Sequence, residues 1–228
     1  MKNTESIKKE YWENNIKGFA GFYDKNSEEN INGNKLVSWL YKKVLFPMEK
    51  KYMYQRHRYV INFINNNIFS GSKAADIGCG SGIYVKKMIQ KGAFVYAYDY
   101  AQNAINLTKE NLTAEELQHA ELSLFDVSKE QIKKVDAAIS IGVLPYVEDH
   151  ATYLKHILPH TEVFLFNFLN KNNFMNRCRR KFTFLDVRYY SYHSLKDITD
   201  VLREYNFEIV KKQKLASGYI LETKRINK

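Results

Sequence analysis

Residues 74–84 read Ala-Ala-Asp-Ile-Gly-Cys-Gly-Ser-Gly-Ile-Tyr, a small apolar strand that runs into a glycine-rich turn. Glycines allow the backbone to turn tightly and let a ligand approach it closely. A helix is expected directly after the turn, and its first amide N–H groups and partial positive charge attract anions. In open parallel sheets, ligands bind outside the carboxyl ends of the strands, which is where this turn falls. The stretch therefore predicts a ligand site in an α/β domain.

Short apolar runs and helical stretches alternate from residue 73 onward. Such alternation predicts a mostly parallel sheet with helices on both faces. The link Lys212–Ser217 is too short for a crossover helix, so the last two strands should pair antiparallel. The seven predicted strands are Lys73–Ile77, Phe94–Tyr98, Glu121–Phe125, Val135–Ile139, Glu162–Phe168, Phe207–Lys211 and Gly218–Thr223, and helices are predicted over residues 82–91, 101–111, 147–158 and 194–205.

The chain before this region has a helical periodicity, from about residue 5 to residue 69. Apolar residues there fall at spacings of three and four, which predicts helices. Pro47 separates two helical segments, and Asn65-Asn66-Asn67 ends the last one. We therefore predict an N-terminal helical cap over residues 1–69 and a ligand-binding domain over residues 70–228.

The composition is that of a globular protein, since 45% of the 228 residues are hydrophobic. No run of about 18 apolar residues is present, and the polar first residues lack the apolar stretch of a signal peptide. Cys79 and Cys178 have no partners at metal-ligand spacing, so we expect no metal site and a reducing, cytoplasmic location. Nothing in the sequence indicates an oligomeric state.

The formal net charge of +10 has two explanations. A basic surface concentrates anionic partners such as nucleic acid, phosphorylated metabolites or acidic lipid headgroups. Alternatively, a genome that favours lysine and asparagine yields basic proteins without any such partner. The lysines are spread along the whole chain, so the sequence leaves both explanations open.

The glycine-rich turn departs from two common nucleotide-binding patterns. The dinucleotide fingerprint G-x-G-x-x-G needs a third glycine where the chain has Ile83, and no G-K-[ST] follows as in a phosphate-binding P-loop. The pattern is instead D-x-G-x-G-x-G, beginning at Asp76. A carboxylate beside the turn would repel a pyrophosphate but can hold an ammonium group. The turn therefore suits an amino acid, which carries both carboxylate and ammonium.

Two further aspartates follow the next two predicted strands. Asp99 lies 21 residues after Gly78, the distance at which an acid accepts hydrogen bonds from ribose hydroxyls. Asp126 ends the third strand, where the exocyclic amine of an adenine could donate to it. Each aspartate could alternatively be a helix cap, because Asp is favoured at N-caps. Their shared position favours one ligand with amino-acid, ribose and adenine parts, which is S-adenosylmethionine.

These motifs resemble the class I, Rossmann-like family of S-adenosylmethionine-dependent methyltransferases of the small-molecule type, over about residues 70–228. Asp136–Leu144 resembles the family's fourth strand and following turn, and Tyr189–Phe207 resembles its late helix and the start of its sixth strand. The resemblance assigns cofactor binding to Asp76, Gly78, Cys79, Gly80, Gly82, Asp99, Tyr100, Asp126, Val127 and Ile141, with Arg58 reaching toward the cofactor's carboxylate.

Two residues are catalytic candidates. Tyr146 occupies the place where relatives carry a histidine or aromatic residue that faces the methyl donor, and it could form a wall for the sulfonium or the substrate. It could equally be an ordinary loop tyrosine. His193 precedes the late helix and could be a general base, although a packed ring beside a helix cap at Ser191 or Ser194 explains it as well. Cys79 is interpreted as a small filler of the turn.

Substrate-binding candidates come from two segments. The cap should close over the substrate, by the same resemblance, and its expected pocket residues are Tyr11, Phe19, Phe22 and Tyr23. The stretch Asn170–Arg188 follows the fifth strand and interleaves basic with apolar residues, and we assign substrate binding to Arg177 and Arg180. This stretch could grip an anionic substrate, touch a membrane surface, or be a solvated basic face over an apolar underside.

The sequence thus predicts methyl transfer to an oxygen or nitrogen atom of a small metabolite, which could be anionic or phosphorylated, such as a sugar, lipid or cofactor precursor. The charge also suggests a nucleic-acid methyltransferase. However, the fourth strand lacks the [DNS]-P-P-[YFW] signature and no RNA-binding module is visible, so no obligate nucleic-acid partner is expected. A non-catalytic S-adenosylmethionine-binding interaction protein is a further alternative, which the intact glycines and the three acids oppose.

Overall fold

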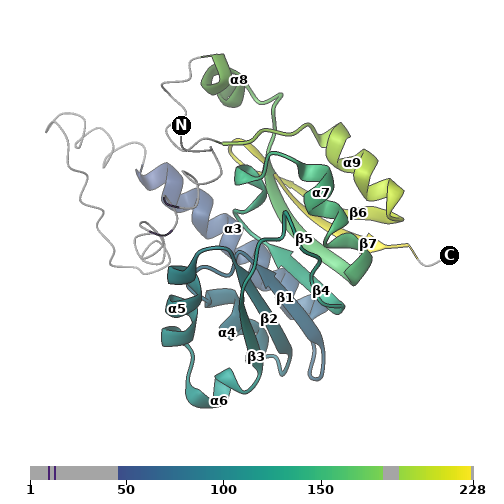
Figure 1. Ribbon diagram of the computed structural model, residues 1–228. Helices are drawn as coiled ribbons and strands as arrows, with labels where there is room; N and C mark the ends of the chain where they lie inside the picture. The colour runs from purple at the N-terminus through teal and green to yellow at the C-terminus, as the bar shows by residue number, and fades with distance from the viewer. Residues whose placement is uncertain (1–9, 11–12, 14–45, 182–189, 227–228) are drawn as a thin grey trace, which may run out of the picture.

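A computed structural model describes residues 10, 13, 46–181 and 190–226 of the chain (Figure 1). These residues form a seven-stranded sheet in the order β3-β2-β1-β4-β5-β7-β6, which confirms the predicted α/β fold. Strands β1 to β5 run parallel, and β7 is antiparallel to both of its neighbours, as predicted. The strands are β1 (Lys73–Ile77), β2 (Phe94–Asp99), β3 (Ala120–Leu124), β4 (Val135–Ser140), β5 (Thr161–Leu169), β6 (Phe207–Lys214) and β7 (Gly218–Arg225).

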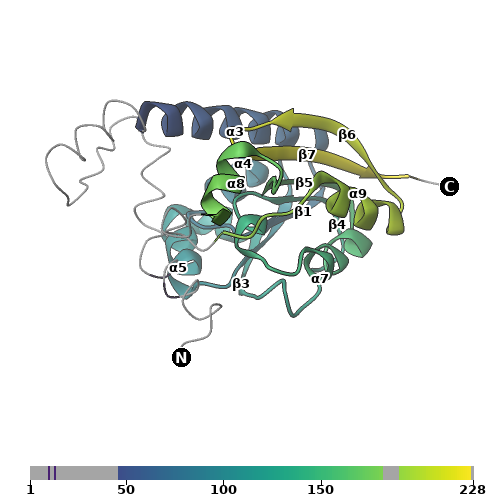
Figure 2. The same cartoon turned by 90° about the horizontal axis from the view of Figure 1, so that it is seen from above.

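Helices cover both faces of the sheet, as Figures 1 and 2 show. In the described residues they are α3 (Phe46–Asn67), α4 (Ile83–Ile89), α5 (Gln102–Asn111), α6 (Ala114–Leu117), α7 (His150–Lys155), α8 (Phe174–Lys181) and α9 (Leu195–Glu204), with 3-10 turns η3 (Leu144–Tyr146) and η4 (Leu158–His160). Residues of α3, α4 and α5 share one core with Ala74 and Leu165. Residues of α7 and α9 share the other core with Ala75 and Phe164. Neighbouring strand residues enter different cores because they point to opposite faces of the sheet.

Helix α3 lies against the sheet and contributes to its first core. Its side chains Val60, Phe63 and Ile64 are buried there. Pro47 is the second residue of α3, where its fixed φ and missing N–H are compatible with a first helical turn. The helix ends at Asn67, as the run of asparagines predicted. The domain boundary after residue 69 stays a prediction, because most of residues 1–45 lie outside the described residues.

Two elements differ from their predicted bounds by more than two residues. The helix expected over residues 147–158 is replaced by the short helix α7 with a 3-10 turn on either side. The carboxylate of Asp149 accepts hydrogen bonds from the N–H groups of Ala151 and Thr152, both at 3.0 Å, so α7 begins only after this cap. Strand β6 was predicted to end at Lys211 but continues to Lys214. The added residues are polar and lack the apolar pattern of a strand, but they pair with β7.

Candidate functional site

Four parallel strands end side by side at one edge of the sheet, in the order β3-β2-β1-β4. Asp76, near the end of β1, pairs with Ala97 of β2 and Ile139 of β4. Asp99 ends β2 and pairs with Leu124 of β3. The sheet therefore brings the loops that carry the predicted cofactor residues to a common edge.

The glycine turn after β1 is shaped by its protein neighbours. The N–H groups of Gly78 and Cys79 both donate to the carbonyl of Tyr98, at 2.7 and 3.0 Å. Gly78 has a φ of 76°, and a Cβ at this position would lie 2.2 Å from Cγ2 of Val143. Position 78 needs glycine for its left-handed backbone and for the close approach of the loop after β4.

Thr108 of α5 packs against the other side of the turn. Its Oγ1 donates to the carbonyl of Gly80 at 3.1 Å and lies 3.5 Å from Sγ of Cys79. A Cβ at Gly82 would lie 2.8 Å from Cγ2 of the same threonine. Cys79 is buried, and burial raises the pKa of its thiol. The side chain of Cys79 therefore suits a filler of the turn and not a nucleophile.

Asp99 is a buried carboxylate that two backbone N–H groups hold in place. Its Oδ2 accepts from Gly80 at 3.1 Å, and its Oδ1 accepts from Ala101 at 3.0 Å. Burial raises the pKa of Asp99 to about 6, against the lowering effect of these hydrogen bonds. Each oxygen keeps further lone-pair capacity. Asp99 can thus accept hydrogen bonds from a diol while remaining fixed to the glycine turn.

Asp76 is the least satisfied acid at this edge. It is 1% exposed, and its Oδ2 has no hydrogen-bond partner among the described residues. Burial, and next the charge of Asp99, raise the pKa of Asp76 to about 8. An unpaired buried oxygen costs about 1–3 kcal/mol, which a ligand N–H donor would recover. The ammonium group of S-adenosylmethionine is such a donor, so the residues present fit this cofactor.

Asp126 follows β3, and its local turn already satisfies its carboxylate. Oδ1 accepts hydrogen bonds from the N–H and Oγ of Ser128, at 3.1 and 2.6 Å. Oδ2 lies 2.8 Å from Nζ of Lys129. Val127 is buried in the second core. Asp126 thus bonds to its own following turn, much as an aspartate that caps a helix would. Adenine binding by Asp126 and Val127 therefore stays a prediction.

A residue far away in the sequence reaches the end of β2. The carboxylate of Glu13 accepts hydrogen bonds from the N–H groups of Gln102 and Asn103, at 2.8 and 3.0 Å, and so caps α5. Tyr100 lies between this cap and Asp99 in the chain, and burial raises the pKa of its hydroxyl. Glu13 therefore lies beside the proposed ribose acid, and no pattern in the sequence singled it out.

The arginine that faces the site from α3 is Arg56. Arg58, the predicted carboxylate ligand, is exposed. A Cβ on Gly142, which follows β4, would lie 3.6 Å from Nη1 of Arg56. Residues two apart point in directions about 200° apart on a helix, so the two arginines lie on different faces. Arg56 could have been found from its spacing of four before the buried Val60.

The loop after β4 is held by buried polar contacts. The N–H of Gly142 donates to Oδ1 of Asn167 in β5 at 2.7 Å, and Asn167 is buried. Ser140 Oγ donates to the carbonyl of Ile77 at 3.2 Å and itself accepts from the hydroxyl of Tyr153. Ile141, a predicted cofactor residue, is half-buried between these contacts. The loop thus has a fixed starting geometry at the edge of the glycine turn.

Tyr146 forms part of an aromatic group on two adjoining loops. Its ring lies 5.4 Å from that of Tyr190, which lies 6.4 Å from that of Tyr192. The N–H of Ser191 donates to the carbonyl of Pro145 at 2.6 Å and joins the two loops. All three tyrosines are half-buried. Tyr146 is therefore oriented by neighbouring aromatic rings, as a wall residue would need to be.

His193 is packed in a way that opposes a role as general base. Its ring is buried, with Nε2 3.1 Å from the carbonyl of Val147 and the ring of His150 at 4.7 Å. Burial, and next the charge of His150, lower the pKa of His193 to about 4. Its backbone also bridges to Asn170 after β5. The geometry favours the alternative in which the His193 ring is packed. The residue then joins the loop after β4, the loop after β5 and the loop before α9.

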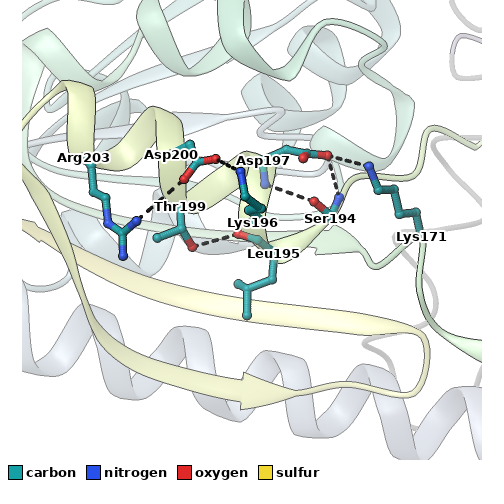
Figure 3. A network of polar contacts seen from close by, with 8 residues as sticks. All are labelled: Lys171, Ser194, Leu195, Lys196, Asp197, Thr199, Asp200 and Arg203. Atoms are coloured by element: carbon teal, nitrogen blue, oxygen red, sulfur yellow. Dashed lines mark hydrogen bonds and ion pairs between the residues drawn. The ribbon is translucent and has the colours of Figure 1, made fainter.

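A network of polar contacts fixes the start of α9, directly after His193 in the chain (Figure 3). Ser194 caps this helix, since its Oγ accepts from the N–H of Asp197 at 3.0 Å while Asp197 Oδ2 accepts from the N–H of Ser194 at 3.2 Å. Nζ of Lys171 lies 2.8 Å from the same carboxylate oxygen. These contacts tie the residue after β5 and the loop before α9 together.

The substrate-binding candidates are not brought together in the described residues. Arg177 and Arg180 are exposed on α8, and Tyr11 and Tyr23 lie outside the described residues, as do Phe19 and Phe22. Among the residues that the structure describes, no group of three His, Cys, Asp or Glu side chains could hold a metal ion. No helix in the described ranges is long and apolar enough to cross a membrane.

Comparison with protein families identifies the domain. The family described as "Methyltransferase domain" matches residues 50–212 of this chain. A ubiquinone biosynthesis O-methyltransferase of Acinetobacter baylyi is 25% identical over 121 residues, which are 49% of this chain and 50% of that protein. The mitochondrial ubiquinone biosynthesis O-methyltransferase of Schizosaccharomyces pombe is 34% identical over 112 residues, which are 48% of this chain and 37% of that protein. The matches thus span about half, or less, of the length of these curated relatives.

Solved structures of methyltransferases share this fold. Magnesium protoporphyrin IX methyltransferase from Synechocystis PCC 6803, with bound SAH, has a TM-score of 0.73 at 18% identity, and covers 98% of this chain and 100% of its own. The N-methyltransferase NodS from Bradyrhizobium japonicum WM9, in complex with S-adenosyl-L-homocysteine, has a TM-score of 0.60 at 14% identity, over 77% of this chain and 88% of its own. At these identities the likeness shows the fold.

Proposed function

The chain belongs to the methyltransferase domain family, and from this membership we propose that it transfers a methyl group from S-adenosylmethionine to a small metabolite. The observation that carries the proposal is the buried carboxyl oxygen of Asp76, which has no partner among the described residues and lies at the glycine turn. Such a group fits a cationic ligand and is costly without one. In this proposal the cofactor's ammonium group pairs with Asp76.

The other residues at the sheet edge have complementary roles. Asp99 accepts hydrogen bonds from the ribose hydroxyls, because two backbone N–H groups already orient its oxygens. Arg56 or Arg58 of α3 pairs with the carboxylate of the cofactor, with Arg56 the better placed beside Gly142. Asp126 and Val127 are assigned to adenine. When bound, S-adenosylmethionine supplies an electrophilic methyl group on its sulfur.

The acceptor is proposed to be an oxygen or nitrogen atom, with oxygen favoured by the names of the curated relatives. The tyrosine group of Tyr146, Tyr190 and Tyr192 is assigned to the acceptor side, where its rings would orient a planar or cationic partner. Alignment of two reacting groups can lower a barrier by about 7–11 kcal/mol. His193 has no part in this proposal, because its ring is buried and contacts a backbone carbonyl.

Calorimetric titration with S-adenosylmethionine tests the cofactor site. The variant Asp76→Asn keeps the shape of the side chain but cannot ionise when the cationic ligand binds. A matched control is Asp136→Asn, because Asp136 accepts a hydrogen bond from the N–H of Lys73 at the opposite edge of the sheet. We expect a loss of affinity of about tenfold or more for Asp76→Asn and none for the control. Equal affinities in all three proteins would refute the ammonium site.

A turnover assay tests the reaction separately. Release of S-adenosylhomocysteine is followed with acceptors that offer hydroxyl, phenol or amine groups, with and without a phosphate. Substitution of Tyr146 by Leu keeps an apolar side chain and removes the aromatic ring and its hydroxyl. We expect the variant to bind the cofactor and to lose turnover. An unchanged rate would remove Tyr146 from the proposed acceptor site.

A further inference from the structure

Helix α8 is a strongly basic element that follows β5. Four of its eight residues are arginine or lysine, and none is acidic. It lies beyond the end of β5, at the edge of the fold where the loops of the proposed cofactor site also emerge (Figures 1 and 2). Helices on the surface of a globular protein usually bury an apolar face and expose a polar one. In α8 this order is reversed.

The inner side of α8 is polar. Asn176 is the buried residue of the helix, and its Nδ2 donates to the carbonyls of Asn170 and Ser217, at 2.8 and 2.6 Å. Its Oδ1 accepts from Nη1 of Arg179 at 3.3 Å. Hydrogen bonds to the ends of β5 and of the β6–β7 hairpin therefore fix the helix. Over Phe174–Lys181 the underside is therefore polar, whereas the sequence alternative of a solvated basic face had an apolar underside.

The apolar side chains of α8 point outward. Phe174 is 79% exposed and Met175 is 50% exposed. Helical spacing places Cys178 on the same side as Phe174, one turn further along, and Arg177 beside them. Arg177 and Arg180 are exposed as well. The outer side of α8 thus carries exposed apolar side chains with cationic groups around them. Other described residues do not cover this side, because the helix is held through Asn176 on its inner side.

We propose that α8 docks the protein on an anionic phospholipid surface. Phe174 and Met175 enter the boundary between headgroups and acyl chains, while the arginines contact lipid phosphates. An RNA strand would satisfy the cationic groups and could stack a base on Phe174, but its phosphates offer Met175 no apolar contact. Charge and apolar exposure together favour the lipid surface. This inference concerns a second surface and does not depend on the proposed methyl transfer.

Docking through α8 would turn the loops of the proposed cofactor site toward the bilayer, because both emerge at one edge of the fold. An acceptor dissolved in the membrane could then reach these loops without crossing bulk water. Asn170–Arg188, the basic stretch predicted to bind the substrate itself, would then bind the membrane in which the substrate is dissolved.

Co-sedimentation with vesicles tests the proposal. The full chain is mixed with vesicles of equal parts phosphatidylglycerol and phosphatidylcholine, or with phosphatidylcholine alone. We expect binding to the anionic vesicles, about tenfold weaker in Phe174→Ser/Met175→Ser and about 10- to 30-fold weaker in Arg177→Gln/Arg180→Gln. Single-site controls are Phe69→Ser, which alters a 60% exposed phenylalanine before β1, and Lys134→Gln, which alters an exposed lysine before β4; each should lose less than half as much binding free energy as the corresponding double variant.

The outcomes separate the possible explanations. Loss in the α8 variants alone supports docking through α8. Equal loss in the Phe69→Ser or Lys134→Gln control would show that overall charge or hydrophobicity drives binding, and would overturn the proposal. No binding to anionic vesicles, or displacement from them by RNA at equal phosphate concentration, would also overturn it.

A native cysteine offers a second measurement. The sequence has two cysteines; Cys79 is buried, whereas Cys178 is partly exposed on α8. An environment-sensitive fluorophore on Cys178 should shift to shorter wavelengths with anionic vesicles and not with phosphatidylcholine. An unchanged spectrum in the presence of bound vesicles would place the contact elsewhere on the protein and refute docking through α8.

Discussion

The turns after β1 and β2 differ from the turn after β3, although an aspartate stands at the end of each strand. Asp76 and Asp99 are buried, and both have raised pKa values because the protein withdraws them from water. Asp126 is only partly buried, and Ser128 and Lys129 satisfy it. In the proposed site the first two acids bind the cofactor, whereas the carboxylate of Asp126 already has protein partners. The three acids thus share a position in the strand pattern but differ in how far the protein satisfies their hydrogen bonds.

The largest expected effect concerns the packing of the first turn. Gly78→Ala adds a Cβ that would lie 2.2 Å from Val143 and imposes a positive φ on a side chain, so we expect a loss of about 2–5 kcal/mol in unfolding free energy. Gly71→Ala is the matched control, because Gly71 has a φ of 82° with nothing within 4 Å of the added atom. It should lose only about 1–2 kcal/mol. Equal losses in urea unfolding would show that contact with Val143 does not matter.

The second prediction compares two acids directly. Asp99→Ala should weaken S-adenosylmethionine binding on the order of 100-fold, because hydrogen bonds to a charged group contribute about 1.5–3 kcal/mol each. Asp126→Ala should weaken it less than about tenfold, because the carboxylate is already engaged with Ser128 and Lys129. Titration calorimetry measures both. The reverse ranking would mean that the turn after β3 rearranges around the adenine.

The third prediction concerns pH. The pKa of Asp76 rises from 3.8 to about 8 on folding, so the folded chain holds a proton that the unfolded chain releases. The free energy of unfolding that protonated Asp76 contributes is fully present below about pH 4. It is lost as the pH rises through 8. Asp76→Asn should therefore stabilise the cofactor-free chain by about 1–3 kcal/mol at pH 8, and less at pH 5. Urea unfolding at both values measures the difference, and a pH-independent gain would exclude the titration of Asp76.

The smallest effect is expected from the distant cap. Glu13→Ala removes two hydrogen bonds at the start of α5, and we expect a loss of about 0.5–1 kcal/mol. Asp149→Ala removes a local cap of the same kind from α7 and should cost a similar amount. Thermal unfolding of both variants measures the losses. An unchanged midpoint for Glu13→Ala alone would mean that the carboxylate of Glu13 does not stabilise α5.

The sequence predicted the fold well because its signals were local. The alternation of apolar runs placed all seven strands, and the short link before β7 predicted its antiparallel pairing. The site was predicted less completely, because its environment depends on contacts between distant segments. Arg56 instead of Arg58 faces Gly142, and this follows from which face of α3 packs on the sheet. The polar underside of α8 rests on Asn176 and the hairpin carbonyl of Ser217, which no local pattern connects.

Strand β6 has a consequence for self-association. It is the outer strand of the sheet beyond β7, and an outer strand exposes unpaired backbone groups that can capture a strand of another molecule. Exposed lysines at positions 212 and 214 place like charges along this edge, whereas Lys211 is paired with Glu222. Two copies brought edge to edge would repel each other, so growth of the sheet from one molecule into the next is disfavoured along this side.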